Sequence, residues 1–449
     1  MSNRAVYPAL KELARGNVPD RASLVYRPFW WEAAPPRDEA STRPPATADV
    51  VIVGSGFTGL SAALTLLRGG RQVAVLERGV PGCGASTRNG GQVGSGNQKF
   101  RVKHLIELRG RAKAESMLRE GVLMLDYIER LITSEGIECH FERCGRFRGA
   151  VREEHYEAMA RDMEDLKAVA GVESFMVPRS EQHKEIGTEL FFGGSVLPND
   201  ASLHPGLYHS GLIQRVEELG GIVRGSAGAE SIIPEKHGFT IVTRQVKIRC
   251  RNVIIATNGY TDGLVPELGR RIVPVGSGQI TTGEIPESLF SRLMPSGRVY
   301  GNTKRVFSYF RPVPGQRRLM WGGRVGRFAS HRSTNAYCHL ARDLLSVFPD
   351  LSDVPVTHGW GGLIGYTYDE VPHLGRTRDG VHFAIGYCGT GVSRATYFGH
   401  KVALQLMEAS ESATAFDDLN FPAFPIHPVA KRAVPFVETW YRLRDHFNI

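Results

Sequence analysis

Apolar residues recur along this chain with two different periods, and the changes from one to the other predict the fold class. Residues 50–53, VVIV, are a continuous β-branched run, typical of a strand buried in a parallel sheet. Residues 54–70 then take helical spacing, and residues 72–77, QVAVLE, give a second strand. This order predicts one βαβ unit with a right-handed crossover.

The two patterns alternate along the rest of the chain. Amphipathic helices are predicted over 111–132, 156–169, 204–219 and 336–348, and strands over 222–225, 239–243 and 252–257. Residues 271–330 alternate strands with turns, and 382–408 give a final strand, Gly-rich turn and helix. We expect 252–257 to return to the first sheet. The chain is therefore predicted to be α/β, with a discontinuous, mostly parallel-sheet domain interleaved with an α+β domain built on an antiparallel sheet.

Composition narrows the class of protein without selecting a partner. The 449 residues are 42% hydrophobic and 22% charged, values that exclude a disordered chain, a collagen and a coiled coil. The net charge of +9 suits nucleic acid, an anionic membrane or acidic substrates equally. We expect no nucleic-acid partner, because the chain has no RNA-recognition motif and no basic run.

The cysteines and the apolar segments indicate a compartment. Six scattered cysteines do not form a disulfide framework and favour a reducing compartment. Cys139, His140 and Cys144 lack a following pair with ligand spacing, so no metal site is expected. The N-terminus has no signal-peptide core, and glycines interrupt the most apolar stretch, 51–67. We therefore expect a cytoplasmic protein without a membrane span.

The strongest chemical motif is G-x-G-x-x-G at the turn between the first strand and helix. Gly54 permits the tight turn, Gly56 lets the backbone approach a pyrophosphate, and Gly59 allows the helix to pack closely on the strand. The helix N-terminus offers free N–H groups to the phosphates. Glu77 ends the second strand, where an acid accepts hydrogen bonds from ribose hydroxyls. This combination predicts a dinucleotide site.

Two later Gly-rich turns help to separate the possible dinucleotides. The motif itself does not distinguish FAD from NAD, since both contain adenosine diphosphate. Residues 252–259 form a strand that ends in Ala-Thr-Asn-Gly, and residues 383–392 form a strand followed by GYCGTGV. A long ligand in two parts, such as FAD, needs such additional turns at the same crevice. An NAD-dependent dehydrogenase remains an alternative, disfavoured because no second G-x-G-x-x-G unit follows.

These motifs resemble the D-amino-acid-oxidase-like (DAO) family of FAD-dependent oxidoreductases, over roughly residues 49–410. The segments that carry the resemblance are VIVGSGFTGLSAALTLL, the loop GASTRNGGQ, ATNGYT and GYCGTGV. The loop is similar to that of the gamma-glutamylputrescine oxidoreductase subgroup and differs from it only at Thr87. The family, which includes glycine and sarcosine oxidases, implies oxidation of an amine C–N bond to an imine that water hydrolyses.

The resemblance also implies a set of cofactor contacts and a domain division. Expected around FAD are Gly54, Ser55, Gly56, Phe57, Thr58, Gly59, Glu77, Arg78, Gly84, Ser86, Arg88, Asn89, Gly90, Gly91, Gln92, Ala229, Ala256, Thr257, Asn258, Gly259, Gly389, Thr390, Gly391 and Val392. The expected Rossmann-like FAD-binding domain comprises 49–100, 198–270 and 355–412, and the substrate-binding domain 101–197 and 271–354. Residues 1–48 are an N-terminal extension, and 413–449 a C-terminal tail.

Three departures from the family pattern affect the expected chemistry. Ile364-Gly365 stands where covalent flavin members have a cysteine before the Tyr-Thr pair, so we expect non-covalent FAD. Met320 replaces the lysine with which sarcosine oxidases activate oxygen, and this leaves open whether oxygen or an electron carrier reoxidises the flavin. Thr390 replaces the histidine of the usual Gly-His-Gly.

Four residues are candidates for the substrate pocket. Arg394, just past the flavin turn, is a candidate for a bidentate contact with a substrate carboxylate, the alternative being a surface arginine. Tyr309, Trp360 and Tyr366 are candidates for the pocket wall, with core packing as the alternative. Hydride transfer from a neutral amine needs alignment more than acid or base groups, so no catalytic triad is expected.

The leading functional hypothesis is an FAD-dependent oxidase of a small secondary amine or N-substituted amino acid, sarcosine-like or iminodiacetate-like, with oxygen reduced to hydrogen peroxide. One alternative is a primary-amine oxidoreductase of the gamma-glutamylputrescine type, or a dehydrogenase that uses another acceptor. Another is an RNA-modifying flavoprotein, since a DAO-like module also occurs in a tRNA-modification enzyme and the positive charge suits phosphates.

Overall fold

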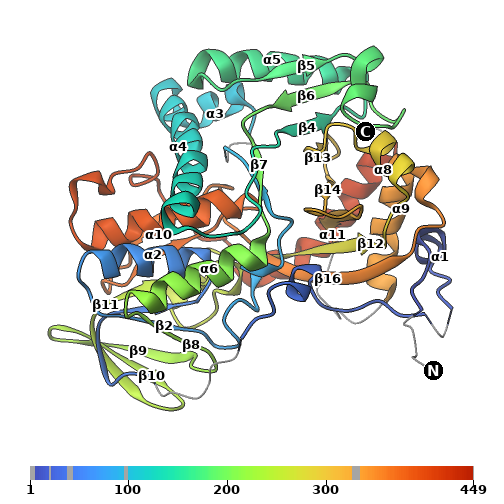
Figure 1. The fold of residues 1–449 in the computed structure, drawn as a ribbon. Helices are drawn as coiled ribbons and strands as arrows, with labels where there is room; N and C mark the ends of the chain where they lie inside the picture. The colour runs from blue at the N-terminus through green and yellow to red at the C-terminus, as the bar shows by residue number, and fades with distance from the viewer. Residues whose placement is uncertain (1–5, 20–21, 38–43, 96–99, 326–333, 448–449) are drawn as a thin grey trace, which may run out of the picture.

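The structure is a computed structural model that describes residues 6–19, 22–37, 44–95, 100–325 and 334–447. The described residues form two eight-stranded sheets and a short two-stranded one, with helices packed around them (Figure 1). The short sheet pairs β3 (Gln92–Val93) with β7 (Ala201–Ser202).

The first sheet contains the predicted βαβ unit at its centre. Strand β1 lies between β2 and β11, parallel to both, and β11 is parallel to β18. The prediction that residues 252–257 return to this sheet is confirmed by the pairing of Val53 with Ile255. The order is β17-β18-β11-β1-β2-β8, and β10 and β9 extend from β11 as antiparallel strands. Its strands are β1 (Thr47–Val53), β2 (Val73–Leu76), β8 (Ile222–Arg224), β9 (Ala229–Glu235), β10 (Gly238–Thr243), β11 (Lys247–Ile255), β17 (His373–Arg376) and β18 (His382–Ile385).

Apolar residues cover both faces of this sheet, which explains the unbroken apolar run at its centre. Successive side chains of a strand point to opposite faces, so Val50 and Ile52 pack on one side and Val51 and Val53 on the other. The first side is covered by helices α2 (Phe57–Arg68), α4 (Arg111–Glu135), α6 (Pro205–Glu218) and α10 (Gly391–Leu406).

The second sheet has one buried face and one face turned to a cavity. Its order is β16-β12-β15-β14-β13-β4-β6-β5, antiparallel except for the parallel pair β4–β13. Phe147, Phe310 and Trp321 lie on its buried face, under α1 (Leu10–Arg15) and α9 (Cys338–Val347). Its strands are β4 (Arg146–Gly149), β5 (Phe175–Val177), β6 (Gly194–Leu197), β12 (Val273–Thr282), β13 (Val299–Asn302), β14 (Tyr309–Pro312), β15 (Leu319–Arg324) and β16 (Val356–Tyr366).

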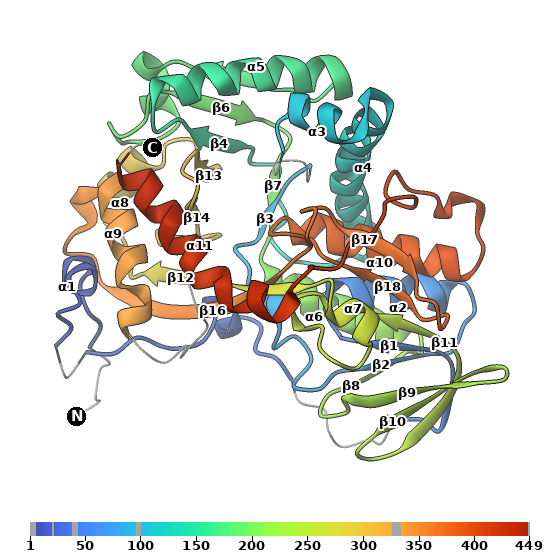
Figure 2. The ribbon, with the colours of Figure 1, turned by 180° about the vertical axis from the view of Figure 1, so that it is seen from behind.

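Three features differ from the division expected from the sequence. Strand β16 lies within the 355–412 segment, but it pairs with β12 of the second sheet over almost its whole length. The N-terminal extension contains α1, which packs into the core of the second sheet. The C-terminal tail contains α11 (His427–Phe447), which is in full view in Figure 2. Its His427 donates a hydrogen bond to the Ile272 carbonyl (2.9 Å). The remaining helices are α3 (Val102–Arg109), α5 (Glu153–Ala170), α7 (Pro266–Gly269) and α8 (Glu287–Leu293).

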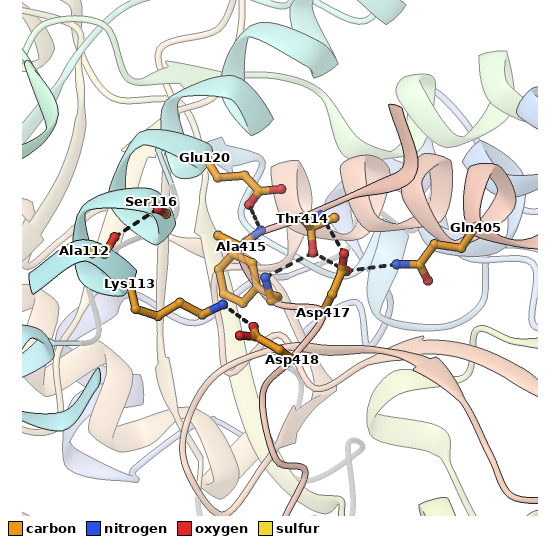
Figure 3. Close-up of polar contacts among 10 residues, drawn as sticks. Ala112, Lys113, Ser116, Glu120, Gln405, Thr414, Ala415, Asp417 and Asp418 are labelled. Carbon is orange, nitrogen blue, oxygen red and sulfur yellow. Dashed lines mark hydrogen bonds and ion pairs between the residues drawn. The ribbon is translucent and has the colours of Figure 1, made fainter. Parts of the chain in front are cut away.

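A polar cluster fixes the segment after α10 on α4 (Figure 3). The buried carboxylate of Glu120 accepts a hydrogen bond from the Ala415 amide. It accepts a second from the Tyr397 hydroxyl (2.9 Å). Burial raises the pKa of Glu120, although both hydrogen bonds oppose that shift. On the surface nearby, Lys113 pairs with Asp418. These contacts hold 414–418 in place beside α4.

No helix in the described ranges combines the length and the apolar character that crossing a bilayer requires. The His, Cys, Asp and Glu residues of the same ranges form no group of three or more able to hold a metal ion.

Candidate active site

A cavity of about 860 Å³ lies between the two sheets. On one side it is lined by residues at the carboxyl ends of β1, β2 and β11 and at the start of α10. On the other side it is lined by residues of the second sheet, among them Ser277, Gln279 and Tyr309. The carboxyl ends of parallel strands are the usual ligand site of an open α/β sheet.

The turn after β1 needs its glycines for two different reasons. Gly54 has a φ of +108°, which L side chains rarely adopt, and a Cβ there would lie 2.8 Å from the Ala256 carbonyl oxygen. A Cβ on Gly59 would lie 2.0 Å from the carbonyl oxygen of Gly54, so this position lets α2 pack against the turn itself. Gly54 therefore lines the cavity, whereas Gly59 is packed behind it.

Polar side chains brace this turn from three directions. Glu77 accepts hydrogen bonds from the Ser55 amide (3.2 Å), the Ser55 hydroxyl (3.0 Å) and the Gly79 amide (3.1 Å). Ser86 Oγ accepts one from the Phe57 amide at the start of α2 (3.0 Å). His209, buried in α6, donates through Nε2 to the Ser55 carbonyl (2.7 Å). Burial lowers the pKa of His209, so the ring is held neutral.

The loop 84–92 forms a long wall of the cavity and is fixed from behind. Gln279 Nε2 and Trp360 Nε1 both donate to the Arg88 carbonyl, at 2.5 and 3.1 Å. Trp30 of the N-terminal extension donates to the Asn89 carbonyl (2.8 Å). The Arg88 side chain donates to the carbonyls of Cys83 (2.7 Å) and Gly361 (3.0 Å). The loop backbone is therefore held by side chains of the second sheet and of the N-terminal extension.

The two later Gly-rich turns meet at the same cavity. Asn258, with a φ of +41°, accepts a hydrogen bond from the Gly386 amide through its side-chain oxygen (2.9 Å). Gly389, also with a positive φ, and Gly391 line the cavity where α10 begins. The first N–H groups of that helix and its positive dipole end favour negative charge on a ligand.

Most of the expected cofactor contacts line the cavity together. Of that set, only Gly59 and Gly91 are outside the lining. A Cβ on Gly91 would lie 2.1 Å from the Leu203 carbonyl oxygen, so this glycine is required by packing.

Two of the four substrate-pocket candidates do not reach the cavity. Arg394 is buried inside α10, and its neighbours Ser393 and Ala395 line the cavity in its place. Burial lowers the pKa of Arg394 to about 10. Trp360 is buried behind Arg88 against Met320, whereas Tyr309 and Tyr366 do line the cavity.

Comparison with known proteins identifies the family to which this site belongs. The model of the DAO family, described as FAD dependent oxidoreductase, matches residues 49–405. The chain belongs to this FAD-dependent oxidoreductase family. It is 29% identical to the probable oxidoreductase OrdL of Rhizobium meliloti (strain 1021), over 93% of this chain and 97% of that protein. It is 28% identical to gamma-glutamylputrescine oxidoreductase of Escherichia coli (strain K12), over 90% and 94%.

The solved structures agree on the fold of this DAO-family oxidoreductase. Glycine oxidase from Geobacillus kaustophilus superposes with a TM-score of 0.72 at 20% identity, covering 85% of this chain and 99% of that one. The predicted fold class, a parallel-sheet FAD domain with a second-sheet substrate domain, is therefore confirmed. The predicted cofactor, FAD, is confirmed by the family.

The cavity's own residues fit an FAD molecule. The side-chain-free surface at Gly54 and Gly56 would be filled by any Cβ, since one on Gly56 would lie 2.9 Å from Ser86 Oγ. This surface lies at the N-terminus of α2, where backbone N–H groups suit a pyrophosphate. Glu77 supplies a carboxylate at the end of β2, and a second helix N-terminus lies at α10. Two helix N-termini facing one elongated cavity suit a long anionic dinucleotide.

Sequence reasoning missed the two arginines that β4 contributes to the second-sheet wall. Arg146 and Arg148 line the cavity there, together with Arg324 of β15. Arg324 Nη2 donates to the Tyr366 hydroxyl (3.1 Å), and Arg146 Nε donates to Asp200 (2.6 Å). Burial lowers the pKa of Arg148. The alternation Arg-Phe-Arg in β4 was the available signal, because residues two apart in a strand share a face.

Proposed function

We propose that this FAD-dependent oxidoreductase oxidises the C–N bond of a small secondary amine or N-substituted amino acid, sarcosine-like or iminodiacetate-like, that carries a negative charge. The supporting observation is the cavity itself, which joins the Gly-rich turns of the first sheet to an arginine-bearing wall of the second. Bound FAD supplies the two-electron acceptor. The substrate gives up a hydride from carbon and a proton from nitrogen, and water hydrolyses the resulting imine.

The chain's residues have separate roles in this proposal. The expected cofactor-contact residues that line the cavity hold FAD, without a covalent bond, and Glu77 accepts the ribose hydroxyls. Tyr309 and Tyr366 orient the substrate. Burial raises the pKa of Tyr309 to about 12, so its phenol stays protonated and serves as a hydrogen-bonding group rather than a base. Its hydroxyl lies 3.0 Å from that of Ser277. The carboxylate contact expected of Arg394 has no support from the cavity lining.

Oxygen is the proposed acceptor and is reduced to hydrogen peroxide. Met320 is fully buried against Gly90 and brings no charge to the cavity. Arg88 and Arg324, which both line the cavity, supply positive charge that favours negative charge developing on oxygen. We also propose that the protein is cytoplasmic, because its six cysteines are scattered along the sequence and favour a reducing compartment.

An anaerobic substrate screen tests this function. Sarcosine, iminodiacetate and glycine are mixed with the yellow holoenzyme, and loss of the visible flavin band reports reduction. We expect bleaching by the anionic secondary amines, and peroxide release when air is admitted. Failure of every amine to bleach the flavin refutes amine oxidation, and reoxidation no faster than that of free reduced flavin refutes the oxidase. Flavin left in an acid-precipitated pellet refutes non-covalent binding.

A second candidate is a longer primary amine of the gamma-glutamylputrescine type. The relative with that name covers 90% of this chain, and the loop 84–92 resembles its subgroup. Adding gamma-glutamylputrescine and putrescine to the same screen separates this candidate from the leading one.

A further inference from the structure

A second cavity, of about 220 Å³, shares two arginines with the first. Arg146 and Arg148 line both cavities and so mark the boundary between them. The far side of the second cavity is formed by α5, including Asp162, and by Arg101 just before α3. Its volume is several times the roughly 30 Å³ that one water molecule occupies in the liquid, so it can hold a group of several heavy atoms.

The charges around this boundary are not balanced. Arg146 is paired with Asp200, whose carboxylate lies 2.6 Å from the arginine Nε. Asp162 Oδ1 accepts a hydrogen bond from the Val102 amide (2.8 Å) and lies across the second cavity. Three arginines, at 101, 146 and 148, thus face two aspartates, an excess of one positive charge.

Of the two arginines that line both cavities, Arg146 is paired with Asp200, and among the described residues Arg148 has no carboxylate partner. Within the described part of the chain, its guanidinium has one side-chain hydrogen bond, a long one from Nε to the Asn302 carbonyl (3.5 Å), and no carboxylate at ion-pair distance. The neighbouring His155 does not add to this positive charge, because burial lowers its pKa and favours the neutral ring. A guanidinium with free donors on a cavity wall suits a carboxylate.

A glycine leaves room beside this arginine. Gly301 of β13 pairs with Arg148 on one side and with Tyr309 on the other, and all three residues line the first cavity. A Cβ on Gly301 would meet no atom closer than the Ser308 carbonyl oxygen at 3.6 Å. The space between the tyrosine and the arginine is therefore open only because this position lacks a side chain.

We propose that Arg148 binds the distal carboxylate of an elongated amine substrate, which passes over Gly301 and enters the second cavity while its amine lies at the flavin. This inference rests on the proposed amine oxidation and adds a subsite to it. Arg146, held by Asp200, and Arg101 contribute the surrounding positive charge. The site thereby favours amines with a remote acid group over equally long amines that lack one.

Two putrescine derivatives test the subsite in the holoenzyme. Gamma-glutamylputrescine has a primary amine at one end and, at the other, a carboxylate beside an α-amino group, whereas the shorter N-acetylputrescine has the primary amine and neither of these remote groups. The Arg148→Met variant keeps an unbranched apolar side chain at this position and removes the charged guanidinium. We expect about a tenfold or larger rise in KM for gamma-glutamylputrescine and less than a threefold change for N-acetylputrescine, because only the former loses a charged two-point contact. Arg148→Lys should recover part of the loss. Arg161→Met, on the exposed surface of α5, is the matched control.

A steric variant tests the route. In Gly301→Val the backbone is undisturbed, because Gly301 does not have a positive φ and its Cβ meets only the Ser308 carbonyl oxygen, at an ordinary contact distance of 3.6 Å. We expect this variant to raise the KM for gamma-glutamylputrescine and to leave the reduction of FAD by sarcosine unchanged. Equal effects of Arg148→Met on both putrescine derivatives, or none on either, overturn the proposal.

A binding measurement distinguishes failure of the subsite from failure of the proposed function. Glutarate is titrated calorimetrically into the holoenzyme, with glutaramide as the uncharged control. Glutarate binding that Arg148→Met abolishes supports the subsite even if no amine bleaches the flavin. Binding that persists in Arg148→Met, or no binding to the unaltered protein at millimolar glutarate, overturns it.

Discussion

Replacing Gly59 with alanine tests how closely the first helix must approach the turn that holds the cofactor. The new Cβ would lie 2.0 Å from the Gly54 carbonyl oxygen, and real Cβ atoms essentially never approach closer than 3.0 Å. The two must therefore separate by at least the difference, 1.0 Å. Helix α2 has no room to retreat, because a Cβ on Gly399 of α10 would already lie 2.2 Å from the Thr58 carbonyl oxygen on its other side.

The expected losses of stability and of FAD affinity follow from this close packing around α2. Overpacking by one methyl group in a closely packed site costs about 1–3 kcal/mol. At roughly 2.1 cal/mol/K per residue, the unfolding entropy of the 449-residue chain is about 0.9 kcal/mol/K, so Tm should fall by about 1–3 °C. Displacing Gly54 also misplaces the backbone N–H groups that face the pyrophosphate. Loss of one charge-assisted hydrogen bond, about 1.5–3 kcal/mol, raises the Kd for FAD roughly tenfold or more.

Thermal unfolding of the apoprotein and titration with FAD measure the two effects separately. The matched control is Gly263→Ala, since a Cβ at Gly263 meets nothing within 4 Å and its φ is not positive. We expect the control to retain the Tm and FAD affinity of the unaltered protein. A Gly59→Ala variant that also retains both would refute the close approach described here.

Two further predictions concern the loop 84–92 and acid stability. Trp31→Phe removes the hydrogen bond from the indole to Thr87 Oγ1 (2.8 Å) that helps to fix this loop, so FAD affinity should fall several-fold, by about 0.5–1.5 kcal/mol. The control variant Trp440→Phe, on exposed α11, should bind FAD normally. Equal FAD affinities of the two variants would contradict the role of the extension. Burial lowers the pKa values of His204 and His382 to about 4, against about 6.5 in the unfolded chain. Between these two pH values the unfolded state binds more protons than the folded state, so the free energy of unfolding falls as the pH falls from 6.5 towards 4. At pH 5 the loss is up to about 2 kcal/mol per histidine. Urea unfolding at pH 7 and pH 5 checks this, and His382→Leu should flatten the slope.

The cofactor half of the site could be predicted because its geometry is local. The spacing of Gly54, Gly56 and Gly59 fixes a turn between a strand and a helix within one short segment. The meeting of three distant Gly-rich turns followed from one topological rule, since carboxyl ends of parallel strands share an edge of the sheet. The observed pairing of β1 with β11, and of β11 with β18, places these turns at that edge.

The substrate half could not be predicted because it depends on long-range pairing. Strand β4 is only four residues long, and its neighbour β13 begins at Val299, far along the chain. Nothing local to Arg148 indicates which strand will lie beside it. Arg394 shows that proximity in sequence to the flavin turn is not enough to place a side chain in the cavity lining. Successive residues of a helix point in directions about 100° apart, so Ser393 and Ala395 can line the cavity while Arg394 is buried.

Glycines inside strands were the overlooked signal for the second wall. A glycine in a strand weakens it and commonly marks a place where another group approaches closely. In β15 a Cβ on Gly322 would lie 2.3 Å from the Tyr309 ring, so the ring rests in the space that this glycine leaves. In β13 the space at Gly301 stays open beside Arg148. The two glycines occupy one row across neighbouring strands, through the pairs Gly301–Tyr309 and Tyr309–Gly322. The tyrosine is thereby laid flat along the sheet, away from the arginine, which separates an aromatic surface near the flavin turns from a cationic one at the second cavity.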